Sequence, residues 1–460
     1  MLFSSLVFLI FFLPLTLAGY FLVPWKWKNA FLLLASLLFY GWSNPPYLIL
    51  LLAEILIGFG SGLLLEKTSR QKGKWILVCS VLIYTGIFVY FKYTDFFIAN
   101  LNAVFDSSIP LLRIVLPAGI SFYTFQIISY NADIWNRKEK ALHSFIDFAM
   151  YISLFCQLIA GPIVRYSDIA PDLAGRKLSL VQASDGFSRF VCGLCKKILI
   201  ANSLFALSES WRTCADPSVA FAWMNAAAIT LYIYFDFSGY SDMAIGLGKM
   251  LGFHFPENFN YPLTALTITD FWRRWHMSLT SWFRDYVYIP LGGSRVSRWK
   301  VIRNLFVVWL FTGMWHGATW NFILWGMGFF VILVLEKFVL NKMRIPTWLT
   351  RMVTIPVLLM SFLLFSDENL TVFASDLQAL WGFGGLPFLT PLSWYLIRSN
   401  LVLLCIAILG SSKTPKKLYE QLVHKEWCSW IPAVLPAVGL FLCLAELTAG
   451  SFNPFLYFRF

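Results

Sequence analysis

Residues 270–293 read DFWRRWHMSLTSWFRDYVYIPLGG, from Asp270 to Gly293. This stretch holds three arginines, two aspartates and a histidine, in a chain of which only 13% of the residues are charged. Thr267, with Asp270 three residues later, has the pattern of a helix start, and Pro290 followed by two glycines supplies a stop. The stretch therefore predicts one amphipathic helix, about as long as a bilayer span but too charged to face lipid.

The expected helix has a polar face and an aromatic face. Four polar side chains follow at i, i+3, i+7 and i+11 and so share one face: Arg273, His276, Thr280 and Arg284. An apolar stripe runs beside them: Trp272, Trp275, Leu279, Trp282 and Tyr286. We expect the polar face to line a functional site, with the rest of the chain as its scaffold.

The remainder of the chain has the composition of a membrane protein. Of its 460 residues, 58% are hydrophobic and 18% are aromatic. A helix needs roughly 20 apolar residues to cross a bilayer core of ~30 Å. Apolar runs lie near residues 5–24, 30–42, 46–65, 75–92, 113–131, 145–164, 187–206, 221–250, 303–318, 319–338, 346–365, 394–411 and 430–448. We expect an all-α, polytopic integral membrane protein with about eleven to thirteen transmembrane or re-entrant helices, and residues 1–460 as one membrane-embedded domain.

The net charge of +12 comes from 36 Lys and Arg against 24 Asp and Glu. The basic residues gather in short loops between apolar runs, such as residues 66–74 and 137–140, which is the positive-inside pattern rather than a nucleic-acid surface. We therefore expect these loops to face the cytosol and to meet membrane lipid or a phosphate-bearing cosubstrate, with no nucleic acid as partner.

The sequence lacks the motifs of several common kinds of functional site. The eight cysteines show no metal-ligand pairing with histidine, and Cys192 and Cys195 have redox-motif spacing but no β-α-β context. Neither a nucleophile elbow, a phosphate-cradling glycine loop nor a zinc-protease motif occurs. We expect no bound metal and no bound cofactor.

Ionisable groups within the apolar runs are the remaining candidates for chemistry, because each costs at least ~2.5 kcal/mol in a bilayer centre. Asp236 and Asp242 lie in the run 221–250, and His316 stands between tryptophans and glycines. His316 is either a buried core histidine that forms hydrogen bonds with a neighbouring residue or part of a functional site. A water-accessible funnel would solve the desolvation problem for five groups together: Arg273, His276, Arg284, Asp236 and Asp242.

Imidazole, with an ordinary pKa of about 6.5, is suited to removing a proton from a hydroxyl near neutral pH. A histidine base with two bound substrates, and no serine nucleophile or metal, fits acyl transfer from a thioester.

Four runs of residues resemble the membrane-bound O-acyltransferase family: 235–248, 270–276, 282–293 and 315–317. Two more, 116–126 and 157–166, resemble its bacterial branch, which acetylates alginate and related exopolysaccharides or peptidoglycan. The similarity extends from residue 1 to about residue 365.

The resemblance implies that the helices surround a central tunnel, with a catalytic core at about residues 113–340. His316 would be the essential histidine, acting as general base or acid, and His276 its supporting partner. Substrate-binding roles would fall to Arg273, Arg284, Asp236, Asp242, Trp315, Trp320 and Asn321. Packing between helices explains the two tryptophans equally well.

The resemblance also implies the substrates and the location. The donor would be cytosolic acetyl-CoA or another acyl thioester, and the protein would be multi-pass in the bacterial cytoplasmic (inner) membrane. The acceptor would be an extracytoplasmic polysaccharide such as alginate, reached through an extracytoplasmic acetyltransferase or polysaccharide-modifying partner. Peptidoglycan and cellulose are alternative acceptors.

The C-terminal tail, residues 449–460, ends in Phe-x-Tyr-x-x-Phe and resembles the end of the small partner protein of teichoic-acid D-alanylation. On that resemblance Tyr457 is a hypothetical acyl relay, and the competing interpretation is that the tail docks on the membrane surface.

Two other classes of function compete with an enzyme. A multispan transporter of an acyl or polysaccharide precursor would explain the intramembrane carboxylates, but no inverted repeat is found. A structural scaffold for an envelope polysaccharide complex would leave His316 unnecessary.

Overall fold

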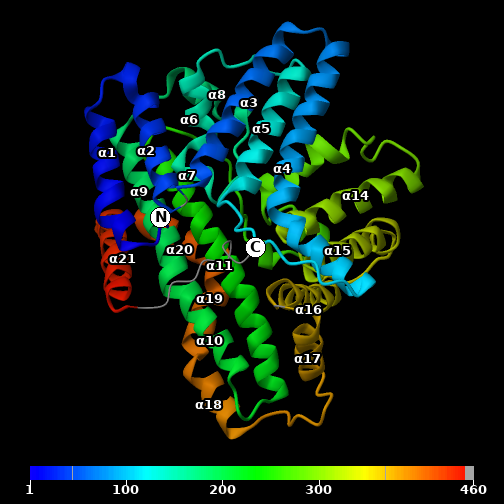
Figure 1. Cartoon of the computed structure of the whole chain (residues 1–460). Coiled ribbons are helices and arrows are strands. Elements are labelled where there is room, and N and C mark those ends of the chain that lie inside the picture. The colour runs from blue at the N-terminus through cyan, green and yellow to red at the C-terminus, as the bar shows by residue number, and fades with distance from the viewer. Residues whose placement is uncertain (44, 368, 451–460) are drawn as a thin grey trace. The chain divides into compact units, whose positions relative to one another are not determined.

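The computed structural model describes residues 1–43, 45–367 and 369–450. In this part of the chain every regular element is a helix (Figure 1). Among the described residues, seven helices are long and apolar enough to cross a membrane, or 8 if the bent pair Pro391–Ser399 and Leu401–Gly410 is one span. The expected all-α, polytopic membrane architecture is confirmed.

The chain divides into two compact units. Unit 1 consists of Met1–Phe190 and Ser241–Glu257, and unit 2 of Val191–Tyr240 and Asn258–Phe460. Two helices run from one unit into the other, α9 (Leu180–Cys195) and α11 (Val219–Met250).

Unit 1 holds the N-terminal helices. They are η1 (Val7–Phe12), α1 (Leu13–Leu22), η2 (Trp25–Trp27), α2 (Lys28–Ser43), α3 (Tyr47–Lys67), α4 (Arg70–Phe105), α5 (Ile120–Trp135), α6 (Phe145–Ser153), α7 (Phe155–Leu158) and α8 (Tyr166–Gly175). The expected run 145–164 is thus divided between the short helices α6 and α7.

Helices α3, α4 and α5 lie side by side in unit 1 (Figure 1). The Asn131 side chain of α5 donates to Ser61 Oγ of α3 and to Ser80 Oγ of α4, both at 2.8 Å. All three residues are buried, and hydrogen bonds between them satisfy polar groups inside an apolar bundle.

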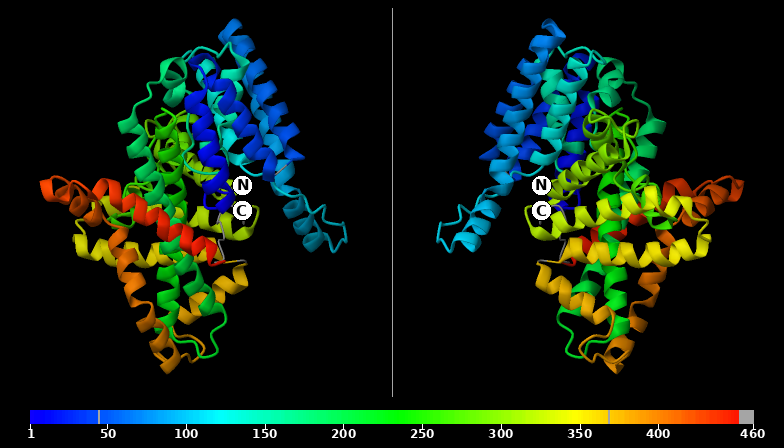
Figure 2. Two further views of the ribbon diagram at one scale, coloured as in Figure 1. Left: turned by 90° about the vertical axis from the view of Figure 1, so that its left-hand side faces the viewer. Right: turned by 90° about the vertical axis from the view of Figure 1, so that its right-hand side faces the viewer.

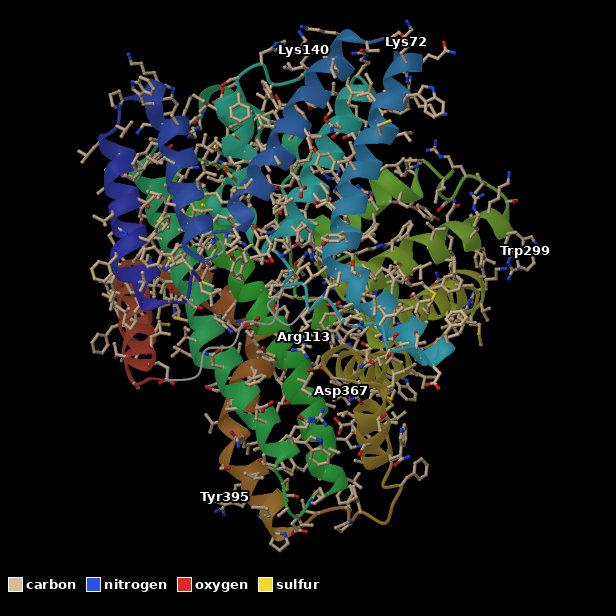
Figure 3. The ribbon with its side chains drawn as sticks, viewed as in Figure 1. Lys72, Arg113, Lys140, Trp299, Asp367 and Tyr395 are labelled. Atoms are coloured by element: carbon tan, nitrogen blue, oxygen red, sulfur yellow. The ribbon has the colours of Figure 1, made fainter. Side chains whose placement is uncertain are left out.

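The basic loops of unit 1 meet at one end. Arg137 Nη1 donates to the carbonyl of Glu66 at 2.8 Å, and Trp135 Nε1 donates to the carbonyl of Arg70 at 3.0 Å. Lys72, in the first turn of α4, and Lys140 lie at this same end (Figure 3). The gathering of positive charge at one end of the bundle is what the positive-inside pattern predicts for a cytosolic face.

Unit 2 holds the remaining helices. They are η3 (Lys196–Ala201), α10 (Asn202–Arg212), η4 (Pro262–Thr264), α12 (Ile268–Trp272), α13 (Met277–Phe283), η5 (Arg284–Tyr288), α14 (Arg298–His316), α15 (Trp320–Phe338), η6 (Leu340–Lys342), α16 (Thr347–Ser366), α17 (Leu370–Leu380), α18 (Pro391–Ser399), α19 (Leu401–Gly410), α20 (Thr414–Val423), η7 (Glu426–Cys428) and α21 (Ile431–Thr448).

Helices α14 and α15 form a closely packed pair (Figure 1 and Figure 2). A Cβ atom added to Gly313 would lie 2.5 Å from the carbonyl oxygen of Phe322, and one added to Gly326 would lie 2.5 Å from that of Trp309. The absence of side chains at these two positions lets the helix backbones approach each other. This pair carries His316 at the end of α14.

Candidate functional site

The stretch 270–293 is not one helix. It forms α12, a break at residues 273–276, α13 and the π-helical turn η5, so the prediction that Arg273, His276 and Arg284 share one helix face is wrong. The predicted start is confirmed, because Thr267 Oγ1 accepts a hydrogen bond from the backbone N–H of Asp270 at 3.0 Å. The helical segment also ends before the glycines, as expected.

His276 breaks the helix because its backbone is left-handed, with φ of 43°. For a residue other than glycine this conformation costs on the order of 1–3 kcal/mol. Asn258 offsets the cost: its carbonyl accepts from the N–H of Met277 at 3.0 Å, and its Oδ1 accepts from Ser278 N at 3.3 Å and from Ser278 Oγ at 2.9 Å. These tertiary hydrogen bonds override the helical tendency of the local sequence.

The same Asn258 side chain sets the tautomer of His276. His276 Nδ1 lies 3.2 Å from Asn258 Oδ1, which must be an acceptor because it also receives the Ser278 N–H. Nδ1 therefore carries the proton, and Nε2 presents a lone pair. Among the described residues, Nε2 has no hydrogen-bond partner, and the side chain is fully buried.

The protonation state of His276 follows from its surroundings. Burial lowers the pKa of His276 to about 3, so the imidazole is neutral at physiological pH. A neutral ring with a buried, basic nitrogen can accept a hydrogen bond from a substrate hydroxyl.

The indole of Trp315 contacts both histidines. Its ring centroid lies 5.7 Å from that of His276 and 4.9 Å from that of His316. Trp325 and Phe365 complete the aromatic surroundings of His316, at 5.0 and 5.2 Å between centroids. His316 is 5% exposed, so the structure brings His276, Trp315 and His316 together in a buried cluster.

Glu336 fixes the start of α12 and was missed by sequence reasoning. Its carboxylate accepts from the backbone N–H groups of Ile268 at 2.7 Å and of Thr269 at 2.8 Å. A negative charge at a helix N-terminus is stabilising, so α15 positions α12 through this residue. The one sequence feature that could have identified Glu336 is that it is a carboxylate near the end of the apolar run 319–338.

The two carboxylates of α11 have cationic partners of their own. Asp236, in unit 2, forms a buried ion pair with Lys197. Asp242, in unit 1, pairs with Arg189 at 2.9 Å, and Arg189 also pairs with Glu257. The described contacts of Asp236 and Asp242 are therefore ion pairs between helices, which sequence reasoning had not identified.

The two candidate arginines lie at the surface of unit 2. Arg273 is exposed, and the neighbouring Arg274 makes the ion pair with Asp270, at 2.9 Å. The side chain of Arg284 is 61% exposed and pairs with Asp285 at 2.7 Å. The described contacts do not join either arginine to His276.

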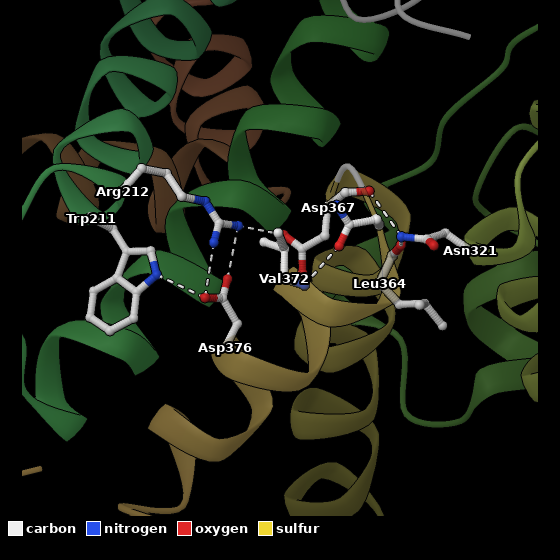
Figure 4. Close-up of polar contacts among 8 residues, drawn as sticks. Trp211, Arg212, Asn321, Leu364, Asp367, Val372 and Asp376 are labelled. Atoms are coloured by element: carbon white, nitrogen blue, oxygen red, sulfur yellow. Dashed lines mark hydrogen bonds and ion pairs between the residues drawn. The ribbon is translucent and has the colours of Figure 1, made fainter. Parts of the chain in front are cut away.

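The last candidates lie around the start of α15. Trp320 is 51% exposed, whereas Asn321 is buried and its Nδ2 donates to the carbonyl of Asp367 at 2.9 Å (Figure 4). Beside it, Arg212 pairs with both Asp367 and Asp376 (Figure 4). Asn321 therefore holds the end of α16. Tyr457 lies outside the described residues.

Known proteins similar to this chain have names of acyl-transferring enzymes. The model of the membrane-bound O-acyltransferase family matches residues 9–375. The probable alginate O-acetylase AlgI of Pseudomonas aeruginosa is 35% identical over 100% of both chains. The peptidoglycan O-acetyltransferase of Helicobacter pylori is 32% identical over 100% of this chain and 98% of its own. The teichoic acid D-alanyltransferase of Bacillus subtilis is 28% identical over 53% of this chain and 65% of its own.

Proposed function

The chain belongs to the membrane-bound O-acyltransferase family and is a multi-pass membrane O-acyltransferase, and on this premise we propose that it transfers an acetyl group to an extracytoplasmic polysaccharide. The donor is a cytosolic thioester, acetyl-CoA in the first instance. The proposed location is the bacterial inner membrane, because only there does one protein reach both a cytosolic thioester and an envelope polymer.

In the proposed reaction His316 is the general base. Its imidazole takes the proton of the acceptor hydroxyl while the hydroxyl oxygen attacks the thioester carbonyl. The carbon–sulfur bond then breaks, and the proton passes from the imidazolium to the departing thiolate, so an ester and a free thiol are formed. His276 positions the hydroxyl by accepting a hydrogen bond at Nε2 and needs no change of charge to do so.

The observation that carries the proposal is the pairing of the two histidines through Trp315 in a buried aromatic cluster. A cluster of this kind excludes bulk water, which would otherwise hydrolyse the thioester. His276 adds a neutral acceptor held in one tautomer by Asn258. A transporter or a scaffold has no need of a histidine whose tautomer and backbone are constrained in this way.

The test is the activity of His316→Ala in cells, measured as ester-linked acetate on the envelope polymer. We expect the acetate to fall by about 10²–10⁴-fold, the usual contribution of a general base. His424→Ala, which removes an exposed histidine, is the matched control. Wild-type acetylation by a folded His316→Ala protein would defeat the assignment.

Alginate is the proposed acceptor because the similar proteins of Pseudomonas aeruginosa and Azotobacter vinelandii are named alginate O-acetylases, at 35% and 37% identity over the full chain. Peptidoglycan is the second candidate, favoured by the 32% identity to the Helicobacter pylori protein. Comparing ester-linked acetate on purified alginate and on purified peptidoglycan, with and without the gene, decides between them. We also propose that a separate extracytoplasmic protein completes the transfer.

Tyr457 is a proposed acyl carrier. Its phenolic oxygen would accept the acetyl group from the thioester and release it to the acceptor or partner, a form of covalent catalysis. Intact-mass measurement of the wild-type protein with donor present should then detect one added acetyl group, absent in Tyr457→Phe. Full transfer by Tyr457→Phe would exclude the relay.

A further inference from the structure

Unit 1 contains a cleft of ≈ 290 Å³ at its basic end. It lies where η2 and the start of α2 meet the start of α6 and the end of α8. Its lining includes Trp25, Lys26, Trp27, Asn29, Asp147 and Arg176. All of these residues belong to unit 1, and none has a role in the proposed acyl transfer.

Arg176 is the most unusual residue of the lining because it is a cation that is only 5% exposed. Its guanidinium packs on three aromatic rings, at 5.6 Å from Tyr20, 5.5 Å from Trp25 and 4.4 Å from Phe253. Nε donates to the Tyr20 hydroxyl at 2.8 Å, but Nη2 has no acceptor among the described residues. Aromatic rings attract a cation, yet a buried guanidinium with a spare donor is costly without an acceptor.

The carboxylate closest to Arg176 in sequence does not fill this role. Asp172 accepts from the backbone N–H of His254 at 2.8 Å and contacts the His254 ring nitrogen Nδ1 at 3.1 Å. The charge of Asp172 is therefore directed to a different residue.

Two lysines add to the positive charge around the cleft. Lys26 is exposed and lines it, and Lys28 is buried beside it, with its ammonium 4.3 Å from the Tyr20 ring and donating to the Tyr20 carbonyl. The lining holds one carboxylate, Asp147, which accepts from Asn29 Nδ2 at 2.7 Å. Cations therefore outnumber the carboxylate, and the cleft favours an anionic ligand.

We propose that this cleft binds a phosphate group, with Arg176 and Lys26 as its ligands. The guanidinium fork matches phosphate oxygens, and the indoles of Trp25 and Trp27 suit the boundary between membrane and water. The phosphate belongs either to a phospholipid headgroup or to a soluble phosphate ester. The cleft binds its ligand without catalysing a reaction, and this binding does not depend on the proposed acyl transfer.

The test measures binding of phosphatidylglycerol to the full chain in neutral detergent by native mass spectrometry. Arg176→Gln removes the buried ligand and Lys26→Gln the exposed one. Lys72→Gln removes an exposed lysine from the same basic end, outside the cleft, and is the matched control (Figure 3). We expect one tight site in wild type and Lys72→Gln, about fivefold weaker binding in Lys26→Gln, and at least about tenfold weaker binding in Arg176→Gln.

Soluble probes then identify the source of the phosphate. If glycerol phosphate or inorganic phosphate displaces the lipid, and this displacement is weaker in Lys26→Gln, the ligand is a soluble phosphate. If neither soluble probe displaces the lipid, the ligand is the lipid headgroup. Equal lipid binding by Lys26→Gln and wild type would overturn the proposal, as would a loss in Lys72→Gln as large as that in Lys26→Gln. If Arg176→Gln does not fold, the two lysine variants decide.

Discussion

The indole of Trp315 lies against the imidazole of His276, with centroids 5.7 Å apart and the ring planes at 68°. Trp315 comes from the last turn of α14, whereas His276 stands at the break before α13. The contact joins two segments that are separate in sequence and seals the His276 ring from solvent. It places the neutral histidine next to the candidate base, because Trp315 is also adjacent to His316.

The first prediction concerns pH. The folded-state pKa of His276 is about 3, below its ordinary value of about 6.5. Below pH 6.5 His276 is therefore protonated in the unfolded chain but remains neutral in the folded protein. The free energy of unfolding falls as the pH decreases. Between pH 6.5 and 5 we expect this one group to cost about 1.5 kcal/mol.

The pH prediction is measured by thermal unfolding in detergent across that range. His276→Asn keeps a donor for Asn258 and tolerates the left-handed backbone, so its unfolding should depend less steeply on pH. His424→Asn, at an exposed position, should retain the wild-type slope. Parallel pH curves for wild type and His276→Asn would contradict the buried, neutral assignment.

The second prediction concerns the α14–α15 contact. Gly313→Ala places a Cβ atom 2.5 Å from a backbone oxygen of the neighbouring helix, so the helices must separate. We expect a loss of about 1–3 kcal/mol, and lower acyl transfer because His316 is carried on α14. Gly328→Ala on α15 meets nothing within 4 Å and should be neutral or slightly stabilising. Equal melting temperatures for the two variants would show that the helix contact is not tight.

The third prediction concerns the buried ion pair between Lys197 and Asp236. Lys197→Met leaves a carboxylate that is 0% exposed without its lysine, and we expect a loss of about 3–5 kcal/mol. Adding Asp236→Asn removes the charge and should recover part of that loss. The measurement is a double-mutant cycle in thermal unfolding. If Asp236→Asn changes stability by the same amount in wild type and in Lys197→Met, the two side chains are not coupled.

The fourth prediction concerns Arg273 and Arg284. Both are exposed, so Arg273→Gln and Arg284→Gln should change stability by only about 0.5 kcal/mol or less. If they position substrates, each should lower acyl transfer by about tenfold, far less than His316→Ala. Arg295→Gln, an exposed arginine in the same part of the chain, should have no effect. Wild-type transfer by both variants would reduce the stretch 270–293 to a structural element.

Much of the protein follows from its sequence alone. The long apolar runs require helices, since backbone polar groups must be satisfied within each segment in a membrane. The helix start at Thr267 follows from local chemistry, because a threonine side chain caps the N–H three residues later. The motifs around His276 and His316 predict the family, and the family model matches residues 9–375.

The tertiary structure alone decided the local geometry of the site. The helical pattern of residues 270–293 fails at His276, because hydrogen bonds donated to Asn258 outweigh helix propensities of less than about 1 kcal/mol per residue. Periodicity also does not reveal which cation meets Asp236. Lys197 is distant along the chain, and only the packing of α11 against η3 brings the two charges together. Electrostatic pairing in this protein is a property of the folded bundle, whereas the long apolar helices follow from the sequence.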